Sequence, residues 1–280
     1  MSVRQTKGPG KAPWSIDDIA YHEIPVDQIR PNRHLFYLVT SASFVEATSD
    51  LYTQNLAAFF ADDPEVLRWL REEWEPEELQ HGAALRRYVE TVWPEFDWEA
   101  AYQKYFDEYS PQTGVVKFAA TQSLELAGRC VVETGTASFY RMLEDSEPEP
   151  VLRQIAHNIS LDEVRHYKYF YHYFNKYSDI EKPGTRKLIS ILWSRATQIN
   201  AHDAYYAFKH TYLGANGPDT VFHQSDYGAF REGVRELAKR HFPREMAIKM
   251  LLKPLGLGRR TSQLVIPLTS FAAKHLVLHQ

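Results

Sequence analysis

The sequence predicts an all-α protein. Apolar residues recur at helical spacing along most of the 280-residue chain, as Phe44, Leu51, Leu56 and Phe59 do near its start. Strand signals are nearly absent, and no repeat of solenoid length is found. Hydrophobic residues make up 44% and charged residues 24% of the chain, so it can bury a substantial core without disulfides.

Proline and glycine clusters divide the chain into its expected elements. Residues 1–33 contain Gly8-Pro9-Gly10 and three further prolines, which predict an extended N-terminal arm. Asp63 and Pro64 predict a helix start, with Asp63 as the N-cap. Pro76 should kink or restart that helix. We expect helices over about 34–60, 64–92, 98–109, 115–144, 151–177 and 183–212.

These elements predict one bundle and one extension. Residues 34–215 form the helical bundle, and residues 216–280 form shorter C-terminal helices packed on it. Residues 231–274 hold ten Lys or Arg and only three Glu. This basic C-terminal segment is either a solvated helical face or a docking surface for an acidic partner.

Composition excludes several classes of protein. The formal net charge of −4 predicts no nucleic-acid partner. A single cysteine, Cys130, excludes a disulfide framework, Cys-rich zinc sites and all-cysteine iron–sulfur ligation. Residues 1–14 lack the apolar core of a signal peptide, and no 18-residue apolar run predicts a membrane span. We therefore expect a cytoplasmic protein with no membrane partner.

Two Glu-x-x-His pairs carry the chemistry: Glu78 with His81, and Glu163 with His166. Residues three apart share one face of a helix, so each pair can present a carboxylate and an imidazole to one point. Each pair lies on the second helix of an expected hairpin. Taken singly, either pair is more typical of a surface glutamate beside a hydrogen-bonded histidine.

A lone glutamate lies on each first helix, in an apolar setting: Glu46 and Glu133. Glu46 and Glu78 each lie 16 residues from the turn at Asp62, or about 24 Å along a helix. In an antiparallel helical hairpin, two residues at equal distances from the turn lie side by side, so Glu46 should lie beside Glu78. The arms from Glu133 and Glu163 to their turn are nearly equal as well, so each lone glutamate should face the pair on its partner helix.

One Glu from each of two helices and Glu-x-x-His from each of the other two is the di-metal arrangement of a ferritin-like bundle. Four carboxylates in a core are costly unless they are paired or bind metal. Two divalent cations would balance their charge. Ligation by Glu and His without Cys suits iron or manganese better than structural zinc.

Three short segments resemble those of a known family. Residues 77–82 (Glu-Glu-Leu-Gln-His-Gly) and 162–166 (Asp-Glu-Val-Arg-His) resemble two signatures of the soluble acyl-carrier-protein desaturases, which are ferritin-like di-iron enzymes. Residues 133–136 (Glu-Thr-Gly-Thr) resemble the Glu-x-x-Thr of that family. The resemblance covers about residues 40–175.

The resemblance implies a ligand set and two supporting residues. Thr136 would assist oxygen or proton handling, although its hydroxyl could equally bond its own helix backbone. Asp162 would accept a hydrogen bond from His81 and fix its tautomer. The cofactor would be two iron ions, with a manganese–iron pair left open. The six ligands would be Glu46, Glu78, His81, Glu133, Glu163 and His166.

The resemblance also implies a reaction and its partners. The protein would be an oxygen-dependent oxidoreductase that desaturates an acyl chain carried on acyl carrier protein or coenzyme A. An external donor such as ferredoxin would supply electrons. Two alternatives stay open: a di-iron monooxygenase of a small molecule, and a non-enzymatic ferritin-like iron or redox protein. A homodimer is also left open.

Other di-iron families fit the sequence less well. Small subunits of ribonucleotide reductase place a tyrosine four residues after the first ligand histidine, where this chain has Leu85. Rubrerythrins carry a Cys-rich module, which one cysteine cannot supply. Di-iron N-oxygenases add a histidine four residues before the second paired glutamate, where this chain has Ile159.

Overall fold

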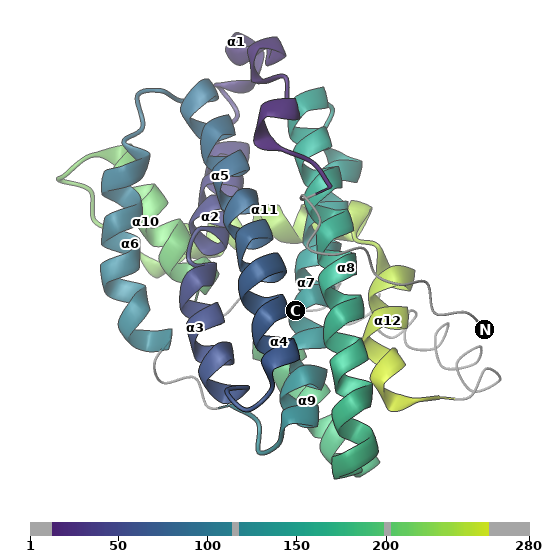
Figure 1. Ribbon diagram of the computed structural model, residues 1–280. Coiled ribbons are helices and arrows are strands. Elements are labelled where there is room, and N and C mark those ends of the chain that lie inside the picture. The colour runs from purple at the N-terminus through teal and green to yellow at the C-terminus, as the bar shows by residue number, and fades with distance from the viewer. Residues whose placement is uncertain (1–12, 114–117, 199–202, 258–280) are drawn as a thin grey trace.

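The computed structural model describes residues 13–113, 118–198 and 203–257, and their regular secondary structure is helical, with no strand among them (Figure 1). The all-α prediction is therefore confirmed. Two helix pairs form the centre. Helix α2 (Arg33–Glu46) packs against α5 (Glu75–Val92), and α7 (Gln122–Ser146) packs against α8 (Pro150–Glu181). Contacts between α5 and α8 join the two pairs.

The described part of the N-terminal arm is not extended. Residues 13–33 instead form short turns that lie against α5. Ile19, Tyr21 and Ile24 are buried, and the Tyr21 hydroxyl donates to the Ala84 carbonyl oxygen at 3.0 Å. Apolar residues among the prolines therefore hold this segment on the bundle. The turns are η1 (Ile16–Asp18), η2 (Tyr21–Glu23) and α1 (Val26–Ile29).

The helix predicted over 34–60 is in fact two helices. Helix α2 ends at Glu46, and α3 spans Ser49–Phe59. No proline or glycine marks the break. Instead the Thr48 hydroxyl donates to the Phe44 carbonyl at 2.6 Å, and the Ser49 hydroxyl donates to the Glu46 carbonyl. Such back-bonding competes with the helical hydrogen bonds, so the chain bends immediately after Glu46.

The second predicted helix restarts near Pro76, as expected. Helix α4 (Pro64–Trp69) begins with Asp63 as its N-cap, and α5 begins at Glu75. Between them lies a π-helical turn, η3 (Leu70–Trp74), in which the Glu75 N–H bonds the Leu70 carbonyl. A π-helical turn is wider than an α-helical one. It is suited to this place because Pro76 has no backbone N–H to donate to the preceding turn.

Helix α6 (Trp98–Thr113) occupies the crossover between the two pairs. Helix α7 begins later than the predicted residue 115, at Gln122, because the Thr121 hydroxyl caps it by accepting from the Leu124 N–H. Residues 114–117 lie outside the described part of the chain. Helix α8 begins where predicted, with Glu149 capping it and Pro150 in its first turn.

The helix predicted over 183–212 is also two helices. Helix α9 (Thr185–Gln198) packs on α7, whereas α10 (Asp203–Asn216) packs on α2 and α6 (Figure 1). Their different partners explain the division. No proline lies between them to predict it, and residues 199–202 lie outside the described ranges.

The described part of the basic C-terminal segment lies in α11 (Gln224–His241), α12 (Arg244–Leu252) and η4 (Lys253–Leu255), and Pro243 separates α11 from α12. Helices α11 and α12 pack on α7. Pro267 and the other residues after 257 lie outside the described part.

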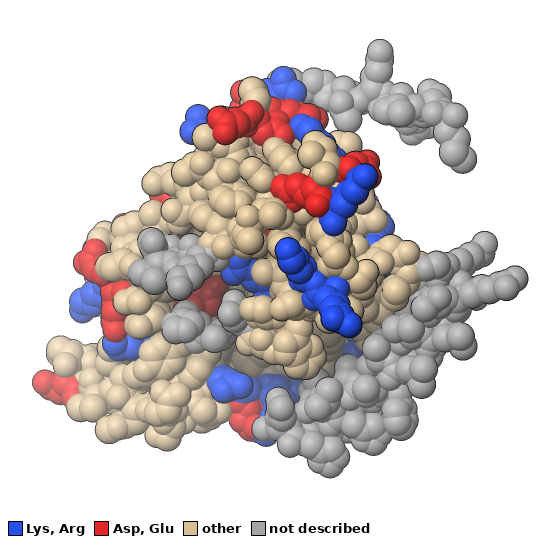
Figure 2. Space-filling view, turned by 90° about the horizontal axis from the view of Figure 1, so that it is seen from below, with Lys and Arg blue, Asp and Glu red and all other residues tan. Residues whose placement is uncertain are grey.

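The three glutamates of this segment pair with three of its cations, within the same helices: Glu232 with Arg235, Glu236 with Lys239, and Glu245 with Lys249. On the end of the molecule shown in Figure 2, Lys and Arg are scattered, and several lie beside Asp or Glu. That face carries no continuous basic patch among the described residues. In the described part of the chain, no helix combines the length and apolar character needed to cross a membrane.

Gly82 allows α2 and α5 to approach closely beside the candidate site. A Cβ at this position would lie 2.7 Å from the Ala47 nitrogen and 2.9 Å from its Cα. Both atoms belong to the backbone, so the helices would have to separate. We expect Gly82→Ala to lower the free energy of unfolding by about 1–3 kcal/mol, measured by urea titration.

Gly184→Ala is the matched control, because nothing lies within 4 Å of its added Cβ. It should leave stability nearly unchanged. Equal stability of the Gly82→Ala and Gly184→Ala proteins would contradict the close approach of the two helices.

Candidate metal centre

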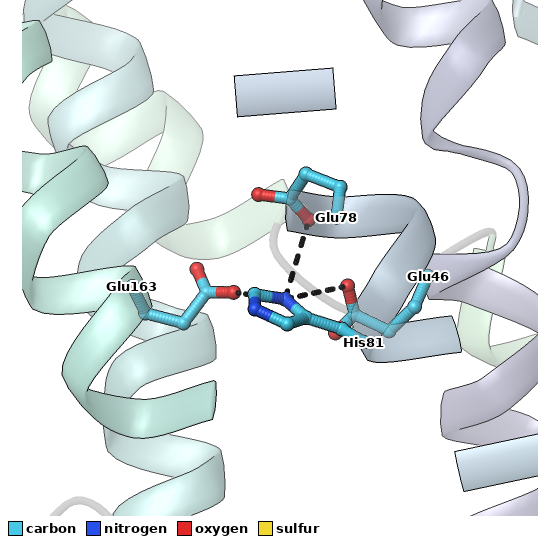
Figure 3. A group of neighbouring side chains, drawn as sticks. All are labelled: Glu46, Glu78, His81 and Glu163. Atoms are coloured by element: carbon cyan, nitrogen blue, oxygen red, sulfur yellow. Dashed lines mark ion pairs between the residues drawn. The ribbon is translucent and has the colours of Figure 1, made fainter. Parts of the chain in front are cut away.

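The six predicted ligands meet in the core between the two helix pairs. All six are at most 7% exposed. They form two groups of four, and within each group the ligand atoms lie within 4.8 Å of one another. Figure 3 shows three carboxylates around one imidazole in the first group. The first group is Glu46, Glu78, His81 and Glu163, and the second is Glu78, Glu133, Glu163 and His166.

Glu78 and Glu163 belong to both groups, and each turns one oxygen toward each imidazole. Glu78 Oε1 lies 3.0 Å from His166 Nδ1, and its Oε2 lies 4.0 Å from His81 Nδ1. Glu163 Oε1 lies 3.3 Å from His81 Nδ1, and its Oε2 lies 4.0 Å from His166 Nδ1. Two neighbouring cations could therefore share both carboxylates.

Glu46 and Glu133 each belong to one group only. Glu46 Oε2 lies 3.9 Å from His81 Nδ1, and Glu133 Oε2 lies 3.7 Å from His166 Nδ1. Each group is thus completed by one carboxylate from a first helix, as the equal hairpin arms predict. The group that contains Glu46 is called the Glu46–His81 position below, and the other the Glu133–His166 position.

Several buried atoms of the cluster lack a hydrogen-bond partner. They are Nδ1 of His81 and of His166, Oε2 of Glu133 and Oε1 of Glu163. An unpaired buried polar atom is costly, and four in one place need an explanation. All four are ligand atoms of the two groups. Cations bound between them would satisfy these atoms together, so the donor set fits a metal pair.

A second layer of carboxylates orients the imidazoles. His81 Nε2 lies 3.1 Å from Asp162 Oδ2, and His166 Nε2 lies 2.8 Å from Glu77 Oε2. Each carboxylate accepts from Nε2–H and leaves Nδ1 free to bind a cation. Each histidine is held by a carboxylate from the other helix. His81 of α5 bonds Asp162 of α8, and His166 of α8 bonds Glu77 of α5. Arg165 joins both carboxylates through ion pairs of 2.8 and 2.7 Å.

Asp162 was predicted to have this role, whereas Glu77 was not. The signal was present, because an acidic residue immediately precedes both Glu78 and Glu163. Trp14 was also missed. Its indole N–H donates to Asp162 Oδ2 at 2.8 Å, and its ring stacks on His81 with centroids 6.3 Å apart. A partner 148 residues away in the chain leaves no local sequence signal.

Hydroxyl groups reach two of the carboxylates. The Thr136 hydroxyl donates to Glu163 Oε2 at 2.6 Å, and its own backbone carbonyls are farther, at 3.3 Å. Thr136 therefore faces the cluster and not only its own helix. The Tyr140 hydroxyl donates to Glu46 Oε1, a contact that the sequence did not predict.

Burial and neighbouring charges oppose one another in the cluster. Burial raises the pKa of Glu46 well above the usual range, and the charges of Glu78 and Glu163 raise it further. Burial raises the pKa of Glu133 in the same way. Burial alone would lower the pKa of His81, but its hydrogen bond to Asp162 and the nearby negative charges of Glu163 and Glu78 outweigh this effect and raise the pKa to about 10. The cluster thus retains protons unless cations replace them.

Comparisons of the chain with family models, with curated proteins and with solved structures find no match. The site must therefore be interpreted from its own geometry. The buried groups could hold metal ions, and the donor atoms are oxygen and nitrogen only. Cys130 is buried but belongs to neither group.

Loss of a carboxylate that belongs to both groups should reduce the number of bound metal ions more than loss of a carboxylate that belongs to one group. We expect Glu163→Ala to abolish binding of two metal ions per chain, because Glu163 contributes to both groups. Glu46→Ala should retain one ion, since the Glu133–His166 position keeps all four of its ligands. Metal content after Mn²⁺ loading and desalting, measured by mass spectrometry, reports the stoichiometry.

Asp179→Ala on the exposed face of the same helix is the control and should bind as the unaltered protein does. Two retained ions in Glu163→Ala would remove this residue from the ligand set.

Proposed function

We propose that the protein is an oxygen-dependent di-iron oxidoreductase with a ferritin-like bundle, and that it desaturates an acyl chain carried on acyl carrier protein or coenzyme A. The observation that carries the proposal is the pair of buried ligand groups that share Glu78 and Glu163. The resemblance of segments 77–82, 133–136 and 162–166 to acyl-carrier-protein desaturases selects the reaction within this class.

Iron is the proposed metal because the site offers carboxylate and imidazole donors without thiolates, a set that also accepts manganese. The Glu46–His81 position would hold one ion and the Glu133–His166 position the other. When bound, a pair of iron ions supplies O₂ activation and the oxidising power to remove hydrogen from an unactivated C–H bond.

The surrounding residues have distinct tasks in this proposal. Asp162 and Glu77 hold the two imidazoles with Nδ1 facing the pocket. Thr136 carries a proton on its hydroxyl, directed at Glu163 Oε2. Trp69 and Trp74 lie edge-on to His166, and Trp14 lies on His81, so the imidazoles are bordered by aromatic surface. This surface would limit access of water.

Desaturation has a defined balance of electrons. Two adjacent C–H bonds of the chain supply two electrons and two protons as the alkene forms. An external donor such as ferredoxin supplies two further electrons, and solvent supplies two protons. Together they reduce one O₂ to two waters, so no oxygen atom enters the organic product.

The basic C-terminal segment is the proposed docking surface for an acidic carrier. Support comes from its ten cations against three glutamates. The ion pairs of Glu232, Glu236 and Glu245 reduce the charge available on α11 and α12. Exposed ion pairs of this kind contribute little stability, so a carrier could replace them.

The reaction is tested with the full chain loaded anaerobically with Fe²⁺, supplied with ferredoxin and its reductase, and mixed with acyl-carrier-protein and coenzyme A thioesters under ¹⁸O₂. We expect an alkene without ¹⁸O and O₂ consumption that depends on the thioester. An ¹⁸O-labelled alcohol would contradict desaturation and support the monooxygenase alternative. O₂ consumption that does not depend on an organic substrate would support the other alternative, a non-enzymatic iron or redox protein.

Removal of the Thr136 hydroxyl should partly uncouple O₂ consumption from alkene formation. Thr136→Val preserves the shape of the side chain and removes its bond to Glu163. We expect normal metal content but a severalfold lower ratio of alkene formed to O₂ consumed, measured with an oxygen electrode and mass spectrometry.

Thr134→Val is the matched control, since this hydroxyl bonds only the Cys130 carbonyl of its own helix. It should keep the ratio of the unaltered protein. Equal ratios in the Thr134→Val and Thr136→Val proteins would exclude a role for Thr136.

A further inference from the structure

The two metal positions are not supported alike. Both histidines are held, His81 by Asp162 and His166 by Glu77. The two unshared carboxylates differ. Glu46 Oε1 accepts a hydrogen bond from Tyr140, whereas no hydroxyl group among the described residues donates to Glu133, whose Oε2 faces His166 as Oε2 of Glu46 faces His81. The asymmetry therefore lies in one hydroxyl group.

Tyr140 is well placed to fix Glu46. Its side chain is 1% exposed and lies on α7, so its hydrogen bond crosses from one helix pair to α2 of the other. Because Oε1 is taken by the hydroxyl, Oε2 is the atom left to bind a cation. That oxygen faces His81 Nδ1 at 3.9 Å. The bond thus sets both the orientation of Glu46 and which of its oxygens is available.

We propose that Tyr140 is a positioning residue that makes the Glu46–His81 position the first to bind a metal ion, with the Glu133–His166 position second. A carboxylate that is already oriented loses less freedom when it binds a cation. This inference rests on the metal-binding part of the proposed function, and it does not depend on the organic substrate.

Glu133, which no tyrosine fixes, is the carboxylate free to change its orientation after both ions are bound. Thr136 follows Glu133 by three residues and so lies on the same face of α7. The side of the cluster near Glu133 and Thr136 is then the adaptable side, and the side near Glu46 and Tyr140 is the rigid side.

The test is an anaerobic titration of the metal-free full chain with Mn²⁺, followed by calorimetry and by the EPR signal of free Mn²⁺. We expect Tyr140→Phe to weaken the first binding step about 10-fold and the second step less, as is typical for loss of a group that orients a ligand. Tyr105→Phe is the control, because this tyrosine is fully buried and its hydroxyl has no hydrogen-bond partner.

A double-mutant cycle separates positioning from a general effect on the fold. In a Glu46→Ala background, Tyr140→Phe should change the affinity for the remaining ion by less than about twofold, because its partner is gone. In a Glu133→Ala background it should weaken binding as strongly as in the otherwise unaltered chain.

Two results would overturn the inference while leaving the proposed function intact. One is an unchanged first step in Tyr140→Phe. The other is an equal loss of affinity with and without Glu46, which would show that Tyr140 acts on the scaffold. Failure of the unaltered chain to bind Mn²⁺ would instead overturn the metal-binding proposal and this inference together.

Discussion

Buried negative charge is the constraint on which this structure depends. Four glutamates from four helices share one pocket in which none is more than 7% exposed. Burial raises the pKa of Glu46 and Glu133, so the pocket must contain either bound protons or cations. Two divalent cations match four carboxylates in charge, and they would also satisfy the unpaired atoms of both imidazoles.

The same polar residues connect the two halves of the bundle. The pair α2 and α5 and the pair α7 and α8 each pack through apolar side chains. Between the pairs, the bonds of His81 to Asp162, of His166 to Glu77 and of Tyr140 to Glu46 cross from one pair to the other. The helices therefore position the ligands, and the ligands with their supporting residues fix how the helix pairs meet. Such a network specifies one arrangement only if every member finds a partner.

Local pattern predicted that these six side chains would meet, because helical spacing and hairpin arms are local properties. An interval of three residues places Glu78 beside His81, and equal arms bring Glu46 level with Glu78. Interactions between distant residues were missed, as with Trp14 on Asp162 and Tyr140 on Glu46, because nothing near these residues marks their partners. The break after Glu46 was missed for a different reason. Hydroxyl groups of Thr48 and Ser49 end the helix there, and the sequence has no proline or glycine at this point to indicate the break.

Anomalous diffraction from crystals of the iron-loaded protein, collected on both sides of the iron edge, shows directly whether the buried carboxylates hold a metal pair. We expect two iron peaks in the core, one among the residues of each group. Only one peak, or iron bound solely at surface carboxylates, would contradict the claim that the buried charge exists to hold a pair of cations.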